Sequence, residues 1–220
     1  MKDLVIFGAG DIAELAHFYF TRDAGRRVAG FTVDAAYVKE PRFAGLPVVA
    51  FEELAAGFPP TEHELFVAVS YSGLNRLREE KCAAAEAQGY GLASYLSSKA
   101  TVWPGFDLRP NCFILEDNTI QPFARIGRNV TLWSGNHIGH HSVIEDNVFL
   151  ASHIVVSGGV HIGANSFVGV NATIRDHVAI GRRCVIGAGT LILADAPEES
   201  VFIGTRSEKS PVPSSRLRRI

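Results

Sequence analysis

The sequence predicts an α/β domain of Rossmann-like type with a parallel sheet, followed by an all-β left-handed parallel β-helix built from hexapeptide repeats. Two observations carry this prediction. Strand and helix patterns alternate over the first hundred residues, and a strict six-residue repeat fills the second hundred. The 220 residues are 47% hydrophobic and 20% charged, with a formal net charge of −2. This composition is typical of a globular protein and offers no basis for coating a nucleic acid.

Residues 1–97 are expected to form the α/β domain, because short apolar runs alternate with segments of helical pattern. The expected strands are residues 3–7, 27–34, 47–50 and 65–70. One helix is expected to begin at the GAGDIA motif and to run to about residue 20, a second to begin near residue 51, and a third to cover residues 74–89. Such alternation is typical of a parallel sheet with helices on its faces.

A glycine-rich turn joins the first expected strand to the first expected helix. Gly8, Gly10 and Ala13 form a GxGxxA pattern, and Asp34 ends the next strand. In this pattern the glycines let a pyrophosphate approach the positive end of the helix, and the acid binds a ribose hydroxyl. We expect a nucleotide-linked sugar to bind at Gly8, Ala9, Gly10, Asp11 and Asp34. The alternatives are a purely structural turn and an NAD site, although the two halves of a dinucleotide fold hardly fit before the repeats.

A second polar segment, VSYSGLNRLR, follows the last expected strand of this domain. Ser70, Tyr71 and Arg78 would then lie at the carboxyl edge of the sheet, together with Asn75. Ligands bind at that edge in open α/β sheets, so we expect these side chains to contact the substrate. The alternative is an ordinary helix start capped by Ser72.

The repeat begins with its strongest run at Ile114, from which every sixth residue is aliphatic through Ile192, fourteen in succession. The fourth residue after each of these is usually small or β-branched, and Gly often follows the aliphatic directly. Stepping backwards extends the pattern to Leu108 and Val102. We therefore expect residues 98–205 to form the repeat domain and residues 206–220 to form a tail.

An α-helix cannot keep one face with this period, because six steps of 100° rotate the side chain away from its starting direction. A coil of three short strands can, with each aliphatic side chain inside and Gly or Asn at turns of positive φ. Residues 102–197 contain sixteen hexads. These make a little over five coils, roughly 25 Å tall at the spacing of stacked strands. A β-sandwich, the alternative, would have irregular loops between its strands.

Six of the eight histidines lie within the repeats. His140 and His141 follow Ile138 and Gly139, which places them on an outward turn, where a neutral imidazole can accept a proton. His153 has the same position in its hexad as His141 but lies two hexads later, on another side of the prism. The other three are expected to be ordinary surface residues: His137, His161 and His177.

These features together resemble the bacterial sugar acyltransferases that group sialic acid O-acetyltransferases with nucleotide-amino-sugar N-acetyltransferases. The resemblance is carried by the repeats, by HIGHHSVI and by the opening FGAGDIAELA. It implies a homotrimer, acetyl-CoA in a groove between neighbouring β-helices, and a nucleotide held by the N-terminal domain. The catalytic histidine of the family falls on His140, and His141 stands where the family often has an acid. Coenzyme contacts are then expected at Phe149, His153, Gly158 and Ala188.

The expected function is transfer of an acetyl group from acetyl-CoA to the amino group of a nucleotide-linked amino sugar, for surface polysaccharide such as O-antigen. His140 acts as the base, with no metal, and Cys184 is too enclosed to be a nucleophile. Other readings are sialic-acid-type O-acetylation, a metal lyase of the γ-carbonic anhydrase type, and a non-catalytic scaffold. Three cysteines without a CxxC pair, and no apolar segment resembling a signal peptide or membrane span, favour the cytoplasm and no membrane partner.

Overall fold

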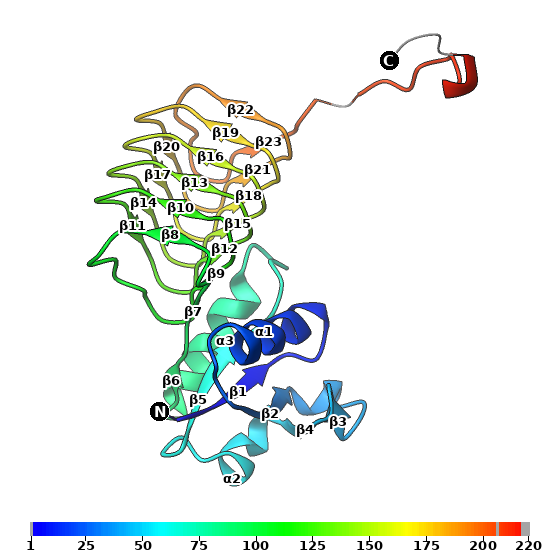
Figure 1. Cartoon of the computed structure of the whole chain (residues 1–220), viewed down its shortest axis with the longest axis vertical. Helices are drawn as coiled ribbons and strands as arrows, with labels where there is room; N and C mark the ends of the chain where they lie inside the picture. The colour runs from blue at the N-terminus through cyan, green and yellow to red at the C-terminus, as the bar shows by residue number, and fades with distance from the viewer. Residues whose placement is uncertain (1, 206, 217–220) are drawn as a thin grey trace.

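The computed structural model describes residues 2–205 and 207–216 of the chain. An α/β domain forms one end of the molecule and a three-sided β-helix forms the other (Figure 1). Beyond the last coil, the tail leads away from the prism and includes a short helical turn, η3 (Ser214–Arg216).

The α/β domain contains a six-stranded mixed sheet in the order β3-β4-β2-β1-β5-β6. The strands are β1 (Asp3–Phe7), β2 (Val28–Val33), β3 (Arg42–Phe43), β4 (Leu46–Ala50), β5 (His63–Val67) and β6 (Gly91–Leu92). Five of them run parallel, as predicted. The sixth, β3, is antiparallel to β4, because Ala44 and Gly45 adopt positive φ and close a tight hairpin between them.

The helices of this domain are α1 (Asp11–Arg22), η1 (Ala35–Tyr37), η2 (Phe51–Glu53), α2 (Leu54–Gly57) and α3 (Arg76–Ala87). The helix expected from residue 51 is thus only η2 followed by a single turn. The strand expected to reach residue 70 ends at Val67 instead. Its neighbour β1 ends at Phe7, which pairs with Val67, so no ladder partner on that side remains for the residues beyond.

The β-helix has three faces, each made of stacked two-residue strands. The first face contains β8 (Thr101–Val102), β10 (Thr119–Ile120), β13 (His137–Ile138), β16 (Val155–Val156), β19 (Thr173–Ile174) and β22 (Leu191–Ile192). The second contains β11 (Arg125–Ile126), β14 (Val143–Ile144), β17 (His161–Ile162) and β20 (Ala179–Ile180). The third contains β7 (Tyr95–Leu96), β9 (Phe113–Ile114), β12 (Thr131–Leu132), β15 (Phe149–Leu150), β18 (Phe167–Val168), β21 (Val185–Ile186) and β23 (Val201–Phe202).

The predicted repeat is confirmed as a parallel β-helix. Stacked strands pair in parallel at a spacing of eighteen residues, as His137 does with Thr119 and Val155. The repeated aliphatic side chains fill the interior of the prism, where Ile138, Leu150 and Ile162 have no exposed surface. The first strand of the β-helix is β7, so the prism begins at Tyr95, a little before residue 98.

One expected strand is missing from the second face. Leu108 keeps the six-residue period, but residues 103–112 run as a loop, and the described part of the chain stacks four strands on this face. Leu108 and Phe106 still pack against the interior of the prism from this loop. The loop stands at the bottom of the second face, where it forms part of a pocket.

Three corners join the faces: the first corner lies between the first and second faces, the second corner between the second and third, and the third corner between the third and first. Helix α3 of the α/β domain is docked on the second corner. Four asparagines with positive φ stack there: Asn111, Asn129, Asn147 and Asn165. The amides of the first three form a ladder, with Asn111 donating to Asn129 and Asn129 to Asn147, both at 2.8 Å, whereas Asn165 donates to Glu79 of α3 at 2.9 Å.

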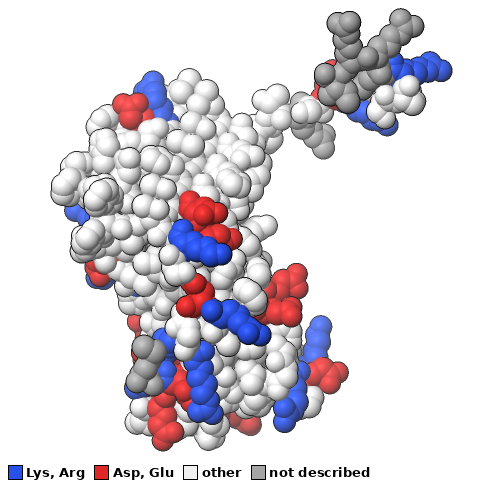
Figure 2. Space-filling model, viewed as in Figure 1, with Lys and Arg blue, Asp and Glu red and all other residues white. Residues whose placement is uncertain are grey.

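Helix α3 attaches to this ladder through Arg78, which is only 2% exposed. Its Nε donates to Oδ1 of Asn129 and its Nη2 to the carbonyl of the same residue, both at 2.9 Å. Burial lowers the pKa of Arg78 to about 10, so the side chain remains a cation at neutral pH. Further along α3, Glu86 forms an ion pair with Arg128 at 2.7 Å. On the side of the molecule seen in Figure 2, charged side chains gather over the α/β domain and the part of the prism next to it, whereas most of the visible prism surface is uncharged.

Candidate active site

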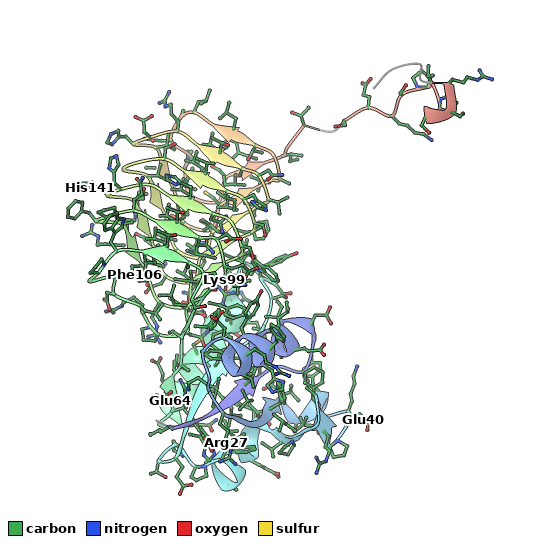
Figure 3. The ribbon with its side chains drawn as sticks, in the orientation of Figure 1. Arg27, Glu40, Glu64, Lys99, Phe106 and His141 are labelled. Carbon is green, nitrogen blue, oxygen red and sulfur yellow. The ribbon has the colours of Figure 1, made fainter. Side chains whose placement is uncertain are left out.

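The first corner carries the two adjacent histidines singled out from the sequence. Phe123, His141, Gly159 and His177 follow one another at this corner, eighteen residues apart, and all have positive φ. His140 comes directly before His141 and is exposed, as is His141. Figure 3 shows His141 at an outer edge of the prism, well away from the α/β domain, where Arg27 and Glu40 are labelled.

The two imidazoles are in direct contact. Nδ1 of His140 lies 3.1 Å from Nδ1 of His141, and the rings are almost perpendicular, at 84°. The backbone N–H of His140 donates to Oε1 of Gln121 in the coil below, at 2.8 Å. The Nδ1 contact turns the Nε2 atom of His140 away from its neighbour, so Nε2 is the nitrogen with which His140 could exchange a proton with a ligand.

The His140 ring lies directly against Gly158 of the next coil. A Cβ atom added to Gly158 would come within 2.7 Å of Cε1 and Nε2 of His140, so only glycine leaves room for the ring in this position. Within the described residues, the N–H of Gly158 donates to no backbone or side-chain acceptor. The backbone of Gly158 therefore lies against the imidazole of His140, and its N–H is a candidate donor to a ligand bound beside that ring.

His141 is held from the other side by an aromatic ring. Its imidazole packs against Phe123, with ring centroids 4.8 Å apart. Phe123 and Gln121 also line a pocket of about 960 Å³ on the second face, which loop residues 103–107 and Arg109 border at the bottom. Trp103, Phe106 and Arg125 contribute to its walls. A ligand in this pocket would therefore lie next to the residues that hold the histidine pair.

The glycine-rich turn lies where the sequence predicted, between β1 and α1. Gly8 has a φ of 132°, and a Cβ atom there would lie 2.7 Å from the carbonyl oxygen of Ala68, so the turn requires glycine. Gly10 is the N-cap of α1 and has nothing within 4 Å of its Cβ position. Ala9, Gly10 and Asp11 are exposed, and this helix start is open to an anionic group.

Asp34 forms an ion pair with Lys81 of α3 beside this turn. The ammonium group of Lys81 also lies 5.3 Å from the ring centroids of both Phe7 and Phe51. Lys81 stands within a charged helix without any local motif, so no sequence pattern pointed to it. Ser70 is half-buried at the end of the same edge, where its hydroxyl is 3.1 Å from that of Ser72.

Three residues expected to contact ligands lie instead at the junction of the two domains. Arg78 is enclosed by its bonds to Asn129, as described above. Tyr71 packs on Phe149 and Phe167 of the third face, with ring centroids 5.0 and 4.7 Å away. Phe149 is consequently only 3% exposed. Arg78 and Phe149 are therefore not open to a ligand in this structure, whereas Tyr71 keeps half of its surface exposed.

The other coenzyme positions lie at two different corners. His153 and Ala188 are exposed at the third corner, where the His153 ring covers Gly135. Gly158 lies at the first corner beside His140. The first face of the prism separates these two corners, and it exposes the apolar side chains of Val155 and Leu191.

The two halves of the candidate site are far apart within one chain. Tyr71, at the carboxyl edge of the sheet, packs on the third face, and in a three-sided prism that face lies opposite the first corner. His140 therefore cannot reach a ligand bound at the sheet edge of its own chain. A site that uses both elements needs a second copy.

The cysteines take no part in this site. Cys82, Cys112 and Cys184 are buried, and burial raises the pKa of the Cys82 thiol to about 12 and that of Cys112 to about 11. Among the described residues, no three His, Cys, Asp or Glu side chains are grouped so that they could hold a metal ion. None of the helices in residues 2–205 and 207–216 is long and apolar enough to cross a membrane.

Comparison with known proteins shows what this architecture is similar to. A family model of the bacterial transferase hexapeptide, comprising six repeats, matches residues 141–176 and 159–194. No curated protein sequence matches the chain. A variant of perosamine N-acetyltransferase from Caulobacter crescentus, solved with CoA and GDP-perosamine, is 25% identical, with a TM-score of 0.83 over 93% of this chain and 94% of that one.

Two further solved structures share the fold at lower identity. The acetyltransferase domain of PglB from Neisseria gonorrhoeae is 22% identical, with a TM-score of 0.81 over 93% of this chain and 97% of that one. WeeI from Acinetobacter baumannii is 16% identical, with a TM-score of 0.71 over the same shares of the two chains. The whole arrangement of α/β domain and β-helix is thus found in other proteins.

Proposed function

Since the chain belongs to the hexapeptide-repeat family of bacterial sugar acyltransferases, we propose that it transfers an acetyl group from acetyl-CoA to the amino group of a nucleotide-linked sugar. The observation that carries the proposal is the geometry of the first corner, where the exposed imidazole of His140 contacts His141 through Nδ1 and lies against the backbone of Gly158. The perosamine N-acetyltransferase structures add support, since their bound molecules are CoA and an amino-sugar nucleotide. Two of those structures carry a substituted histidine.

The proposed reaction is a direct transfer. The amine nitrogen attacks the thioester carbon, and Nε2 of His140 accepts the proton that the amine loses. The carbonyl oxygen becomes an oxyanion, and we assign its stabilisation to the backbone N–H of Gly158, which has no acceptor among the described residues. When the intermediate collapses, the carbon–sulfur bond breaks and the thiolate of coenzyme A takes up the proton. No acyl-enzyme is needed, which agrees with the burial of every cysteine in the chain.

We place the nucleotide at the N-terminal domain, on the glycine-rich turn. The open start of α1 at Gly10 suits a pyrophosphate, and Asp34 suits a ribose hydroxyl, as in Rossmann-like folds. The ion pair of Asp34 with Lys81 orients the carboxylate and adds a cation at the same edge. Ser70 and Tyr71 complete the proposed sugar-nucleotide contacts, without Arg78.

The proposed enzyme is a homotrimer, because the nucleotide site and His140 of one chain lie on opposite sides of the prism. A neighbouring copy that covers the first face would bring its own sheet edge or third corner near His140. The apolar side chains of Val155 and Leu191 on that face are suited to such a contact. Gly158 of one copy and His153 and Ala188 of the next would then line one coenzyme groove.

The proposed compartment and pathway follow from the acetyl donor, acetyl-CoA, and from the sugar that accepts the acetyl group. Acetyl-CoA is a cytoplasmic metabolite, so we place the reaction in the cytoplasm, in the biosynthesis of surface polysaccharides such as O-antigen. O-acetylation of a sugar would use the same base and the same coenzyme groove. It differs from N-acetylation only in that the sugar offers a hydroxyl in place of an amine.

The test is an assay of coenzyme A release with acetyl-CoA and a panel of nucleotide-linked amino sugars, with matched hydroxyl sugars as controls. We expect release only with the amino sugars, and an N-acetylated product by mass spectrometry. Light scattering at micromolar concentration should give three times the chain mass of 23.8 kDa. Release with the hydroxyl sugars alone would assign O-acetylation, and release with none of the panel would contradict the proposed function.

A further inference from the structure

His141 is the residue that touches the proposed base most directly. Besides the Nδ1 contact of 3.1 Å with His140, its ring packs on Phe123 and its backbone N–H lies 3.4 Å from the carbonyl oxygen of Pro122. Its φ is 60°, a conformation that most residues with a side chain avoid. The ring is therefore held by its neighbours in a position that brings Nδ1 to His140.

The Nδ1 contact permits only one proton between the two rings. If both Nδ1 atoms carried hydrogen they would repel each other, and if neither did, no hydrogen bond would form. When His140 donates, its own Nε2 is free of hydrogen in the neutral ring and can act as a base. When His141 donates, the neutral His140 must carry its hydrogen on Nε2 and cannot accept a proton there.

We propose that His141 is a positioning residue that selects the reactive tautomer of His140. The neutral His141 imidazole accepts the Nδ1–H of His140, and its own hydrogen lies on Nε2, which faces solvent. This inference rests on the proposed role of His140 as the base. His141 thereby supplies the hydrogen-bond acceptor that a carboxylate would supply, but without a negative charge.

The proton balance is complete without a titration of His141. The amine nitrogen forms a bond to the thioester carbon, and its proton moves to Nε2 of His140. The His140 imidazolium keeps its Nδ1–H bond to His141 through this step. The carbon–sulfur bond then breaks, and the departing thiolate takes the proton from Nε2. His140 returns to the tautomer in which it began.

Two substitutions separate the hydrogen bond from the backbone conformation. His141→Asn tolerates the positive φ and places an amide oxygen near the former position of Nδ1, so an acceptor is retained. His141→Gly tolerates the same φ but has no acceptor. We expect His141→Asn to keep kcat within about threefold of the unsubstituted enzyme and His141→Gly to lower it by about tenfold or more, with both KM values little changed.

A spectroscopic measurement reads the tautomer without relying on turnover. Nitrogen NMR of the full chain labelled with ¹⁵N-histidine, assigned by comparison with His140→Asn, reports which ring nitrogen of His140 carries hydrogen. We expect the Nδ1–H form in the unsubstituted protein and in His141→Asn, and a shift to Nε2–H in His141→Gly. In a His140→Ala background, His141→Gly should cause no further loss of activity.

The outcomes distinguish the inference from the function on which it rests. Equal kcat for His141→Asn and His141→Gly, or an Nε2–H tautomer of His140 in the unsubstituted protein, would overturn the role of His141. Absence of acetyl transfer by the unsubstituted enzyme would overturn the proposed function. The NMR result would still report the tautomer in that case.

Discussion

The first and second corners of the β-helix share one backbone geometry and differ in every other respect. Both place a residue of positive φ at intervals of eighteen. At the second corner, four of these positions are asparagines: the amides of the lower three join the coils, and that of Asn165 donates to Glu79 of α3. At the first corner the positions are held by Phe123, His141, Gly159 and His177, and both histidines there are exposed.

The difference shows where the chain departs from the best local choice. A positive φ costs a residue with an ordinary side chain about 1 kcal/mol, whereas Gly and Asn adopt it readily. The lower four positions of the second corner use asparagine, which suits the conformation, whereas Arg183 and Glu199 have positive φ at the top of the same corner. The first corner accepts rings that do not suit it, and His141 is the one that contacts the proposed base. At His141, the contact with His140 gives the ring a proposed role that offsets this conformational cost.

The largest expected effect tests the chemical side of this comparison. His140→Ala or His140→Asn should lower kcat by about 10² to 10⁴, the usual value of a positioned general base, with little change in the affinity for either substrate. The matched control is His177→Asn, at the same corner two coils higher, which should keep normal turnover. Variants are compared as assemblies that still bind coenzyme A. A His140 variant of near-normal kcat would refute the base assignment.

The next largest effect is expected on stability and tests the structural role of the second corner. Arg78→Ala removes the buried donors to Asn129 and leaves its carbonyl unpaired, so the free energy of unfolding should fall by about 2 to 4 kcal/mol. Chemical denaturation measures this loss. Arg76→Ala is the matched control, because its side chain is 79% exposed and pairs only with Glu80 on the same helix, and should change stability by less than about 0.5 kcal/mol. Unchanged stability with a raised KM for the sugar nucleotide alone would instead place Arg78 in the substrate site.

A smaller effect on kcat is expected from a substitution at Gly158, which lies against the His140 ring. Gly158→Ala would bring a methyl group within 2.7 Å of the His140 ring and displace it. We expect kcat to fall by about 10- to 100-fold, since displacement of a base by less than an ångström is costly. Gly91→Ala is the control, because its Cβ would meet nothing closer than 3.8 Å. If only the KM for acetyl-CoA changed, Gly158 would be a coenzyme contact rather than a support for the imidazole.

The smallest effect concerns the conformational free energy that a histidine of positive φ costs at the first corner. His177 is exposed and has a φ of 58°, so His177→Asn should raise the free energy of unfolding by about 0.5 kcal/mol. A series of thermal unfolding curves measures the gain. Lower stability in this variant would mean that the packing of the His177 ring over Gly159 outweighs the conformational cost.

Much of the fold could be predicted because its signals are local and repeated. The six-residue period identified the coils, and the glycine-rich turn identified the start of α1. Strand β3 could not be predicted, because it depends on a hairpin turn of only two residues. The loop at Leu108 could not be predicted either, because its sequence keeps the aliphatic period of a strand. The proposed base could be selected from its turn position and the family resemblance. Lys81 could not, because its partner Asp34 is 47 residues away.

By itself the sequence determined the succession of an α/β domain and a coil of hexads, since strand alternation and a period of six are written in the order of apolar residues. Only the tertiary structure decided which polar residues face a ligand and which face each other. Arg78 and His140 both follow apolar segments and both carry donors, yet one lies beneath a docked domain and the other at an open corner. The physical reason is that burial of a polar side chain depends on which distant surface packs against it, and that is set by the contacts of whole elements.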